Sequence, residues 1–440
     1  MSAQRLDFIS SPGVALTGRI AVPGDKSISH RAVMLGAIAE GDTHIRGFLD
    51  SADTRATLRA FGLMGVKTER AGKHEIIVHG AGLRGLRAPG RALDLGNSGT
   101  SVRLLAGLLA GQDFDSELRG DASLMQRPMG RIVDPLRRMG AAISCTPQGT
   151  LPIVIHGGNR LVGIAYTLPV ASAQLKSSLL LAGLYAQGTT TITEPVITRD
   201  HTERMLRHFG CPVEYRDNRI SIHSRSLRGG EVRVPGDISS AAFFMVAASI
   251  VPGSELIIEG VGINPTRHAV IEILKRMGAD IRLDARGEIN EEPVADIHVK
   301  YRPLQGIAVP AELVPIAIDE FPALFVAAAC ARGETVVTGA AELRVKESDR
   351  IAAMAEGLAR LGIEVEPRED GIRIQGGRLC GGEVGSHTDH RIAMAFAVAG
   401  AAAAGPVRIR DCINVDTSFP GFVDTAGRAG MAVTSEQCDG

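Results

Sequence analysis

The chain has 440 residues, a formal net charge of −1 at pH 7, no tryptophan and an aromatic content of only 4%. This balance excludes the basic field and the aromatic stacking surface that nucleic-acid-binding proteins use. The longest apolar stretch, residues 392–404, has about half the length that spans a bilayer, so we also expect no membrane partner.

The six cysteines show no C-x-x-C spacing and no accompanying histidine pattern, which argues against a zinc site. In a chain of this length they are typical of reduced thiols. The N-terminus lacks the charged-then-apolar pattern of a signal peptide. A hydrophobic content of 45% with 52 glycines suits a tightly packed α/β protein. We therefore expect a cytoplasmic α/β protein that holds no metal.

The first expected elements surround a polar stretch, Pro-Gly-Asp-Lys-Ser-Ile-Ser-His-Arg at residues 23–31, which precedes an apolar run at 32–39. The start of a buried helix presents unpaired backbone N–H groups and the positive end of the helix dipole. With Lys26 and Arg31 beside it, this start indicates a phosphate or carboxylate site. The same turn recurs at residues 235–240 without lysine or arginine. The turn itself is therefore interpreted as architecture, and the cations of the first copy as chemistry.

A longer pattern recurs six times along the chain: the end of an amphipathic helix, a glycine, and a short strand. The glycines stand at positions 65, 140, 210, 278, 362 and 430. A glycine between a helix and a β-branched run is typical of a helix C-terminus. Each copy also contains a more apolar helix, predicted at residues 29–40, 98–110, 173–187, 239–251, 322–332 and 391–404. Helices that are apolar nearly all round are buried.

Each copy is therefore predicted as a βαβαββ unit. Such units are longer than solenoid repeats, so the pattern favours an α/β (α+β) protein with two pseudo-symmetric lobes of three units each. The two Pro-Gly-Asp turns lie three units apart, which predicts a lobe boundary near residues 229–234.

Five of the six buried helices begin with polar or charged residues, and the second helices add more cations. In isolation each pattern has a structural interpretation: an N-cap and tight turn at 95–100, a solvated face at Arg127, and surface ion pairs at 346–350. Their joint occurrence at equivalent places in the repeats favours function. If the helix N-termini of both lobes face one cleft, their amides and cations suit substrates with several anionic groups.

Seven motifs, in order along nearly the whole chain, resemble those of the enolpyruvyl transferases, and within them the branch that uses shikimate 3-phosphate. They lie at residues 24–31, 95–100, 126–130, 171–174, 318–320, 344–350 and 389–391. The resemblance implies two lobes, one of residues 23–234 and one of residues 1–22 and 235–440. It also implies transfer of the enolpyruvyl group of phosphoenolpyruvate to the 5-hydroxyl of shikimate 3-phosphate, a step of the shikimate pathway to chorismate and the aromatic amino acids. No cofactor is implied.

The resemblance also implies roles for single residues. Asp319 resembles the base on the 5-hydroxyl, Glu347 the acid that protonates the methylene carbon, and Lys26 and Lys346 the lysines between the substrates. Shikimate 3-phosphate ligands would be Lys26, Ser27, Arg31, Ser172, Ala173, Gln174, Arg199, Asp319 and Lys346. Phosphoenolpyruvate ligands would be Lys26, Asn97, Gly99, Arg127, Gln174, Arg350 and Arg391.

Two positions depart from the family pattern: Asp416 stands where some members have a lysine, and Glu342 where some have an asparagine. Because Gly99 carries no side chain toward the phosphoenolpyruvate pocket, we expect inhibition by glyphosate, which occupies that pocket in this family.

We expect a monomer. The alternatives are a UDP-N-acetylglucosamine enolpyruvyl transferase, whose cysteine acid has no counterpart at residues 112–126, and a non-catalytic repeat scaffold.

Overall fold

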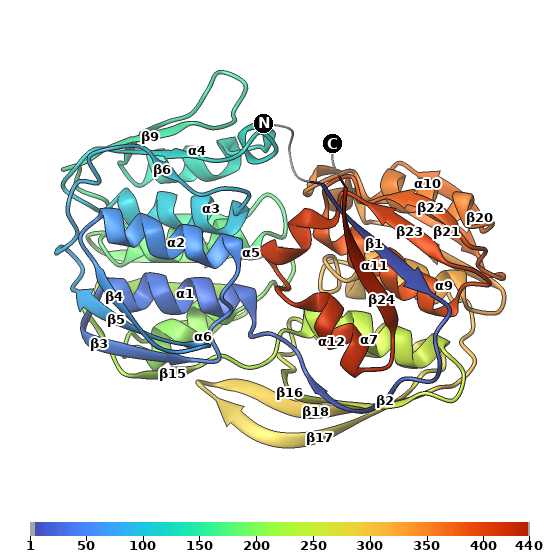
Figure 1. Ribbon diagram of the computed structural model, residues 1–440. Coiled ribbons are helices and arrows are strands. Elements are labelled where there is room, and N and C mark those ends of the chain that lie inside the picture. The colour runs from blue at the N-terminus through green and yellow to red at the C-terminus, as the bar shows by residue number, and fades with distance from the viewer. Residues whose placement is uncertain (1–4, 439–440) are drawn as a thin grey trace. The chain divides into compact units, whose positions relative to one another are not determined.

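The structure, a computed structural model, describes residues 5–438 and divides into two compact units (Figure 1). The N-terminal lobe consists of Gly24–Val234 with the short segment Ile289–Glu292. The C-terminal lobe consists of the described residues up to Pro23, Pro235–Glu288, and the chain from Pro293 onward. Each lobe has its own hydrophobic core.

The N-terminal lobe contains three successive βαβαββ units, as the repeat predicts. Its helices are α1 Lys26–Ala37, α2 Ala52–Leu63, α3 Gly99–Leu109, α4 Gly130–Arg138, α5 Ala173–Gly183 and α6 His201–His208, with a 3₁₀ turn η1 at Leu124–Gln126. Its strands are β3 Ala39–Arg46, β4 Lys67–Gly72, β5 Glu75–Ala81, β6 Leu93–Asp94, β7 Ser116–Arg119, β8 Ala142–Ser144, β9 Ile153–His156, β10 Ala165–Thr167, β11 Thr189–Thr193, β12 Val213–Arg216, β13 Arg219–His223, β14 Leu227–Arg228 and β15 Glu231–Arg233.

The three sheets of this lobe share one strand order. The orders are β6-β7-β9-β8, β10-β11-β13-β12 and β14-β3-β5-β4, with β15 also beside β3. In each sheet the first strand is parallel to the second, as β15 is to β3, and the other pairs are antiparallel. The first unit thus takes its opening strand from the end of the lobe, which closes the repeat.

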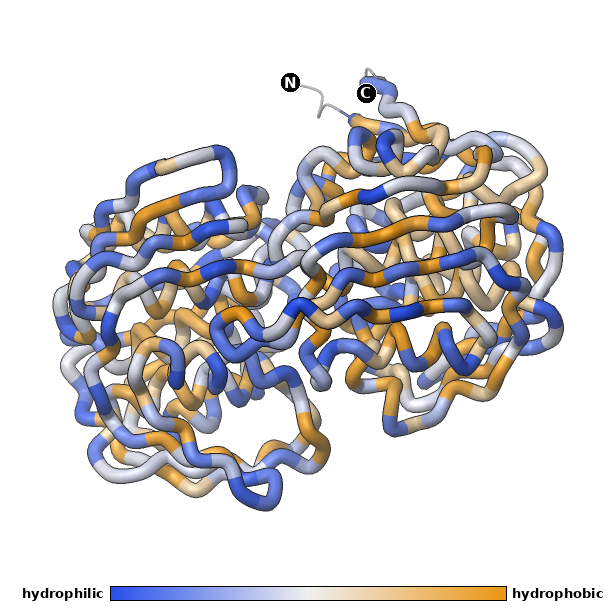
Figure 2. The backbone as a smooth tube through the Cα atoms, turned by 90° about the horizontal axis from the view of Figure 1, so that it is seen from below, coloured by the Kyte–Doolittle hydropathy of each residue, from blue (hydrophilic) through white to orange (hydrophobic). Residues whose placement is uncertain are grey.

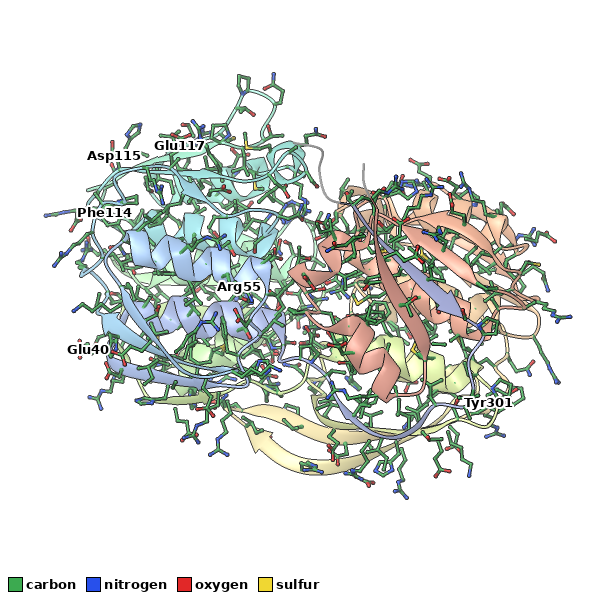
Figure 3. The ribbon with its side chains drawn as sticks, in the orientation of Figure 1. Glu40, Arg55, Phe114, Asp115, Glu117 and Tyr301 are labelled. Atoms are coloured by element: carbon green, nitrogen blue, oxygen red, sulfur yellow. The ribbon has the colours of Figure 1, made fainter. Side chains whose placement is uncertain are left out.

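The helices α1, α3 and α5 are the buried ones, as their apolar sequences predict. The helices α3 and α5 pack so closely that a Cβ on Gly107 would lie 2.0 Å from the carbonyl oxygen of Ser178. Figure 3 places Glu40, just past α1, and Phe114, between α3 and β7, at the end of the lobe away from Arg55 in the first turn of α2. The first turns of α3 and α5 meet through Thr100 and Gln174, and His30 of α1 meets Ser98 at the start of α3, so the N-terminal parts of these helices lie together.

The C-terminal lobe repeats the pattern. Its helices are α7 Ile238–Ile250, α8 Ala269–Arg276, α9 Phe321–Ala329, α10 Arg350–Arg360, α11 His390–Ala402 and α12 Phe422–Arg428, with 3₁₀ turns η2 Ala311–Leu313, η3 Ala341–Val345 and η4 Cys412–Thr417. Its strands are β1 Arg5–Ser11, β2 Thr17–Ala21, β16 Glu255–Gly262, β17 Asp280–Ile289, β18 Glu292–Lys300, β19 Glu334–Val337, β20 Glu364–Arg368, β21 Gly371–Gln375, β22 Gly382–Gly385, β23 Val407–Arg410 and β24 Ala432–Cys438.

The two N-terminal strands complete two sheets of this lobe. Strand β1 lies between β23 and β24 in the order β22-β23-β1-β24, and β2 pairs with β16 in the order β17-β18-β16-β2. The third sheet has the order β19-β21-β20. In Figure 2, hydrophobic and hydrophilic stretches follow one another along the chain, as expected for strands with one buried face.

The six glycines of the repeat all have positive φ angles, from 84° at Gly210 to 98° at Gly140. Each follows the last residue of an amphipathic helix by two positions, where a left-handed backbone ends the helix. The predicted fold class and the predicted helix ends are confirmed. Among the described residues, no helix is long and apolar enough to cross a membrane.

The cysteines whose side chains the structure describes are free thiols. Burial raises the pKa of Cys330 and that of Cys412 to about 12. These thiols are therefore protonated and unreactive at neutral pH, in line with the reduced thiols that the sequence predicts.

Candidate functional site

The predicted site residues form two clusters, one in each lobe. The N-terminal cluster lies at the starts of α1, α3 and α5 and on the loops before α4 and α6. It contains Lys26, Ser27, Arg31, Asn97, Gly99, Arg127, Ser172, Ala173, Gln174 and Arg199. The C-terminal cluster surrounds the starts of α9, α10 and α11 and contains Asp319, Lys346, Glu347, Arg350 and Arg391.

The start of α1 is fixed by Asp25, whose carboxylate accepts a hydrogen bond from the backbone N–H of Ile28 at 2.9 Å. This cap leaves the next residue, Lys26, at the helix N-terminus, where its ammonium lies 2.8 Å from Asp53 Oδ2. Asp53 comes from the first turn of α2 and holds the lysine in place.

Arg31, one turn further along α1, is almost fully buried. Its Nε donates to Thr202 Oγ1 at 2.6 Å, its Nη2 to Ser177 Oγ at 2.9 Å, and its Nη1 to the carbonyl of Ser27 at 3.0 Å. Burial lowers the pKa of Arg31 to about 10, which still leaves a cation at neutral pH. This guanidinium therefore ties α1 to α5 and α6.

A second set of contacts joins α3 to the loop before α4. Arg127 Nη2 donates to Asn97 Oδ1 at 2.7 Å, and the amide of Asn97 donates to Asp121 at 2.8 Å. A Cβ on Gly99 would lie 3.2 Å from Arg127 Nη1 and 3.0 Å from Arg103 Nη1. Two guanidinium groups therefore converge at the N-terminus of α3, which favours anions.

Helix α5 contributes Gln174, which bridges toward α3. Arg103 Nη1 donates to Gln174 Oε1 at 2.6 Å, and Gln174 Nε2 donates to Thr100 Oγ1 at 3.1 Å. Ser172 caps α5 by accepting from the backbone N–H of Leu175 at 3.3 Å. Gln174 lies in a helix that is mostly apolar, where a polar side chain needs a hydrogen-bond partner. Arg103 and Thr100 are its partners.

In the C-terminal cluster, two cations lie close to the carboxylate of Asp319. Lys346 Nζ and Arg350 Nη1 each lie 3.5 Å from Asp319 Oδ1. Arg391 Nη1 donates to the backbone carbonyl of Asp319 at 3.0 Å. Glu342, at one of the two departures from the family pattern, lies 4.0 Å from Lys346 Nζ. Three cations thus gather at Asp319, two at its carboxylate and one at its backbone carbonyl, which is the arrangement expected around anionic substrates.

Arg350 is the most deeply buried member of this cluster, with 1% of its side chain exposed. Its Nε donates to Asp389 Oδ2 at 2.8 Å, and its Nη2 to Glu347 Oε2 at 2.6 Å. Burial by itself raises the pKa of the Asp389 carboxyl, but Arg350 outweighs it and holds that pKa below its ordinary value. The interpretation of residues 346–350 as surface ion pairs is therefore wrong for Arg350.

Further acidic and basic residues support the C-terminal cluster without having been predicted as site residues. Asp389 caps α11 by accepting from Arg391 N at 2.9 Å. Glu320, fully buried beside Asp319, accepts a hydrogen bond from Ser239 Oγ, and Arg267 Nη2 donates to the same hydroxyl at 2.7 Å. The second Pro-Gly-Asp turn contains no lysine or arginine. Arg267, from another segment of the same lobe, places a cation beside it. Asp389 and Glu320 could have been found from the sequence, because they belong to the 389–391 and 318–320 motifs, whereas Arg267 belongs to none of the seven motifs.

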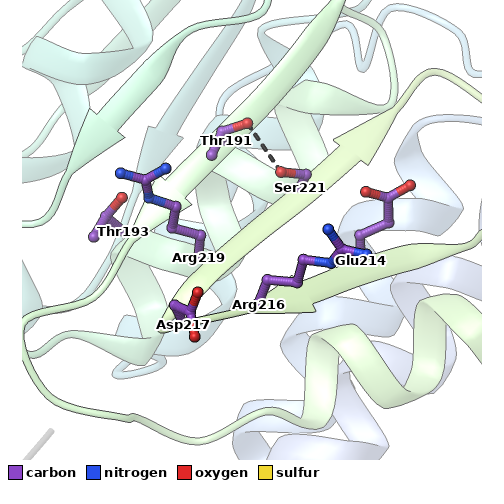
Figure 4. A pocket seen from close by; sticks show the side chains of 7 residues that line it. All are labelled: Thr191, Thr193, Glu214, Arg216, Asp217, Arg219 and Ser221. Carbon is purple, nitrogen blue, oxygen red and sulfur yellow. Dashed lines mark hydrogen bonds between the residues drawn. The ribbon is translucent and has the colours of Figure 1, made fainter.

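A separate hollow of about 620 Å³ lies on the exposed face of the sheet formed by β11, β13 and β12 (Figure 4). Thr191 and Ser221, whose hydroxyls lie 2.9 Å apart, form part of its lining. None of the predicted site residues lines this hollow. Among the described residues, no group of three or more His, Cys, Asp or Glu side chains is arranged to hold a metal ion.

Comparison with known proteins identifies the family. A family model described as EPSP synthase (3-phosphoshikimate 1-carboxyvinyltransferase) matches residues 10–426. The 3-phosphoshikimate 1-carboxyvinyltransferase of Alkalilimnicola ehrlichii is 60% identical over 437 residues, covering 99% of this chain and 98% of the relative. That of Halorhodospira halophila is 62% identical over 425 residues, covering 96% of each chain.

Comparison with solved structures gives the same family. An EPSP synthase structure from Acinetobacter baumannii matches with a TM-score of 0.88 and 56% identity, covering 98% of this chain and all of that one. The enolpyruvyl transferase NikO from Streptomyces tendae matches with a TM-score of 0.79, 99% coverage of this chain and 19% identity, a likeness of fold alone. The resemblance drawn from the seven motifs is confirmed: the chain belongs to the EPSP synthase family.

Proposed function

We propose that the chain transfers the enolpyruvyl group of phosphoenolpyruvate to the 5-hydroxyl of shikimate 3-phosphate and releases phosphate, with the two clusters as its working parts. Its relatives of about 60% identity are transferases of this kind. The observation that carries the proposal is the C-terminal cluster, in which Arg350 pairs with both Asp319 and Glu347, and Lys346 and Arg391 also contact Asp319.

The N-terminal cluster supplies most of the substrate ligands. For shikimate 3-phosphate we assign Lys26, Ser27, Arg31, Ser172, Ala173, Gln174 and Arg199, with Asp319 and Lys346 from the C-terminal cluster. For phosphoenolpyruvate we assign Lys26, Asn97, Gly99, Arg127, Gln174, Arg350 and Arg391. The hydrogen bond from Arg127 to Asn97 and the buried pair of Arg350 with Asp389 support the second set, because both arginines are held in one orientation.

The reaction needs an acid, a base and stabilised negative charge. In the addition step, Glu347 gives a proton to the methylene carbon of phosphoenolpyruvate while the 5-hydroxyl attacks the neighbouring carbon and Asp319 takes the hydroxyl proton. In the elimination step, the Glu347 carboxylate takes a proton back from the new methyl group, the C–O bond to phosphate breaks, and the leaving phosphate takes the proton held by Asp319, which restores both side chains. Arg127, Arg350 and Arg391 stabilise the carboxylate and phosphate of the donor, and Lys26 and Lys346 the charge that develops on the leaving phosphate. No step requires a metal or a cofactor.

We further propose that the chain acts as a cytoplasmic monomer and that glyphosate, an anion carrying a phosphonate and a carboxylate, binds among the phosphoenolpyruvate ligands. The position of Gly99 beside Arg127 supports the last point, because no side chain of residue 99 occupies the space next to the guanidinium. The alternative acceptor, UDP-N-acetylglucosamine, is not favoured by the relatives, which are 3-phosphoshikimate enzymes.

Phosphate release on mixing phosphoenolpyruvate with shikimate 3-phosphate tests the function. Glu347→Gln and Asp319→Asn should each lower kcat by about 10²-fold or more, because each removes a proton-transfer group. Glu356→Gln is the matched control. Glu356 lies on the exposed side of α10, where it pairs with Arg360 at 2.8 Å, and its replacement should leave kcat unchanged.

All four proteins should show the same far-ultraviolet circular dichroism and the same melting temperature within a few degrees. Wild-type activity in either catalytic variant would contradict its assigned role. Phosphate release with UDP-N-acetylglucosamine in place of shikimate 3-phosphate would contradict the proposed acceptor.

A further inference from the structure

A buried ionic triad in the N-terminal lobe lies outside the residues assigned above. Lys176, on α5, places its ammonium 3.0 Å from Glu194 Oε2 and 2.7 Å from Glu203 Oε1. The three side chains are 1%, 0% and 4% exposed. Taking three charges out of water costs several kcal/mol per ion before their mutual attraction is counted. A buried cluster of this kind indicates a role other than stability.

The two carboxyl groups of the triad hold Lys176 as a cation, whereas burial raises the pKa of Glu194 above its ordinary value. Burial alone would lower the pKa of Lys176, but Glu203 and Glu194 together raise it above its ordinary value. Two carboxyl groups thus share one ammonium. The second carboxylate oxygen of Glu203 is buried and has no hydrogen-bond partner among the residues that the structure describes. The carboxyl group of Glu203, which shares its ammonium with Glu194, therefore also acts on neighbouring cations.

Those cations are the proposed ligands of the acceptor substrate. Glu203 attracts the guanidinium of Arg31, whereas Arg199 repels it. Two arginines assigned to one anion thus repel each other while the anion is absent, and the triad offsets part of that repulsion. The carboxylates stabilise the pair of cations in advance, so the substrate need not assemble it.

The triad also fixes the loop that carries Arg199. Lys176 Nζ donates to the backbone carbonyl of Thr198 at 3.3 Å, and Thr198 Oγ1 donates to Glu194 Oε1. Thr198 immediately precedes Arg199 in the sequence. On the other side, Arg31 Nε donates to Thr202 Oγ1, next to Glu203 on α6. One ammonium thereby links α5, the loop at 194–200 and α6.

We propose that Lys176, Glu194 and Glu203 are positioning residues for recognition of the 3-phosphate, holding Arg199 where it meets that group. The inference rests on the proposed function, because Arg199 is assigned there as a ligand. The triad touches neither substrate; it acts through Arg199. Its loss should therefore weaken use of shikimate 3-phosphate and spare the handling of phosphoenolpyruvate.

The test is a charge-free variant, Lys176→Met/Glu194→Gln/Glu203→Gln, which keeps side-chain length and leaves no unpaired buried charge. Initial rates are measured with shikimate 3-phosphate and with shikimate, which lacks the phosphate. We expect the preference in kcat/KM for the phosphorylated substrate to fall about tenfold or more, the loss expected for one charge-assisted hydrogen bond. The KM for phosphoenolpyruvate should stay within about twofold of wild type.

A second experiment uses the variant Arg199→Ala. It should cause a loss of the same preference, and adding the charge-free triad to Arg199→Ala should cause no further loss, because both changes remove one interaction. Losses that multiply would overturn the inference, since the triad would then act without Arg199. Arg84→Met, at an exposed ion pair 3.1 Å from Asp113 in the same lobe, is the control and should keep the wild-type preference.

A folded charge-free variant with the wild-type preference would also overturn the inference and leave the proposed function intact. Wild-type protein that shows no activity with shikimate 3-phosphate would instead contradict the proposed function. If the charge-free variant does not fold by circular dichroism, Glu203→Gln, which keeps the pair of Lys176 and Glu194, replaces it under the same criteria.

Discussion

The absence of a side chain at Gly99 leaves room for the guanidinium groups of Arg103 and Arg127. Its backbone N–H belongs to the first turn of α3, and the space where a Cβ would stand is bounded by the guanidinium groups of Arg103 and Arg127. Distances of 3.0 and 3.2 Å are shorter than ordinary contacts of a methyl group. An added methyl must therefore displace at least one of the two arginines.

Gly99→Ala should raise the KM for phosphoenolpyruvate and weaken inhibition by glyphosate, because Arg127 is a proposed ligand of both. A shift that weakens one charge-assisted hydrogen bond corresponds to about a tenfold change. Steady-state kinetics with and without glyphosate measure both constants. Equal sensitivity of wild type and variant would contradict the assignment of glyphosate to this place.

The site residues that sequence could predict are those that stand in short motifs at helix starts. Lys26, Asn97 and Arg391 each belong to such a motif. The contacts of their acidic neighbours are less predictable: Asp53 meets Lys26 from another helix, and Glu320, although it stands in the 318–320 motif, meets Ser239 from a segment 81 positions away. A side chain that acts by contacting another residue carries no local signal, because its role depends on tertiary packing.

At the scale of elements, three helices of the N-terminal lobe meet around one neutral histidine. His30 of α1 is fully buried, with Nδ1 2.8 Å from Thr57 Oγ1 of α2 and 3.3 Å from Ser101 Oγ of α3. Thr57 and Ser101 also bond to each other at 2.7 Å. Burial, reinforced by the nearby charges of Lys26 and Arg31, holds the pKa of His30 well below its ordinary value.

This histidine predicts an acid-sensitive stability. Below pH 6.5 the unfolded chain binds a proton at His30 that the folded chain does not, so the free energy of unfolding falls as pH falls, by up to about 1.4 kcal/mol per pH unit. His30→Asn should lower stability at pH 7 and lose less on going to pH 5.5 than wild type. Urea unfolding at the two pH values measures the difference. Equal losses in both proteins would contradict the prediction.

The βαβαββ units could be predicted because every amphipathic helix ends at a glycine with positive φ, as at Gly65 and Gly140. The partners of the outer strands could not. Strand β3 of the first unit pairs with β14 and β15 from the end of the lobe, and β1 lies between β23 and β24. Periodicity reports which segments are strands, whereas pairing depends on which edges remain unpaired after the units pack.

At the scale of the whole molecule, the lobes differ in how their chain is arranged. The N-terminal lobe is built almost entirely from one continuous segment, Gly24–Val234, which includes the strands that close its first sheet. The C-terminal lobe needs the N-terminal strands as well. Phe8, Leu16 and Ile20 are buried in its core, and β24 pairs with no other strand than β1 among the described residues.

Separate fragments should therefore behave differently. A fragment of residues 24–234 should fold alone, because it retains its sheets and core, and should unfold cooperatively in urea by circular dichroism. A fragment of residues 235–440 should not, since it lacks β1 and β2 and exposes the apolar surface they cover. A chain that runs from 235 to 440 and continues directly with residues 1–23 should regain a cooperative transition. The register allows this join because the end of β24 at Cys438 pairs with Arg5 at the start of β1. Cooperative unfolding of the fragment 235–440 alone, or its absence in the rejoined chain, would contradict the role assigned to these strands.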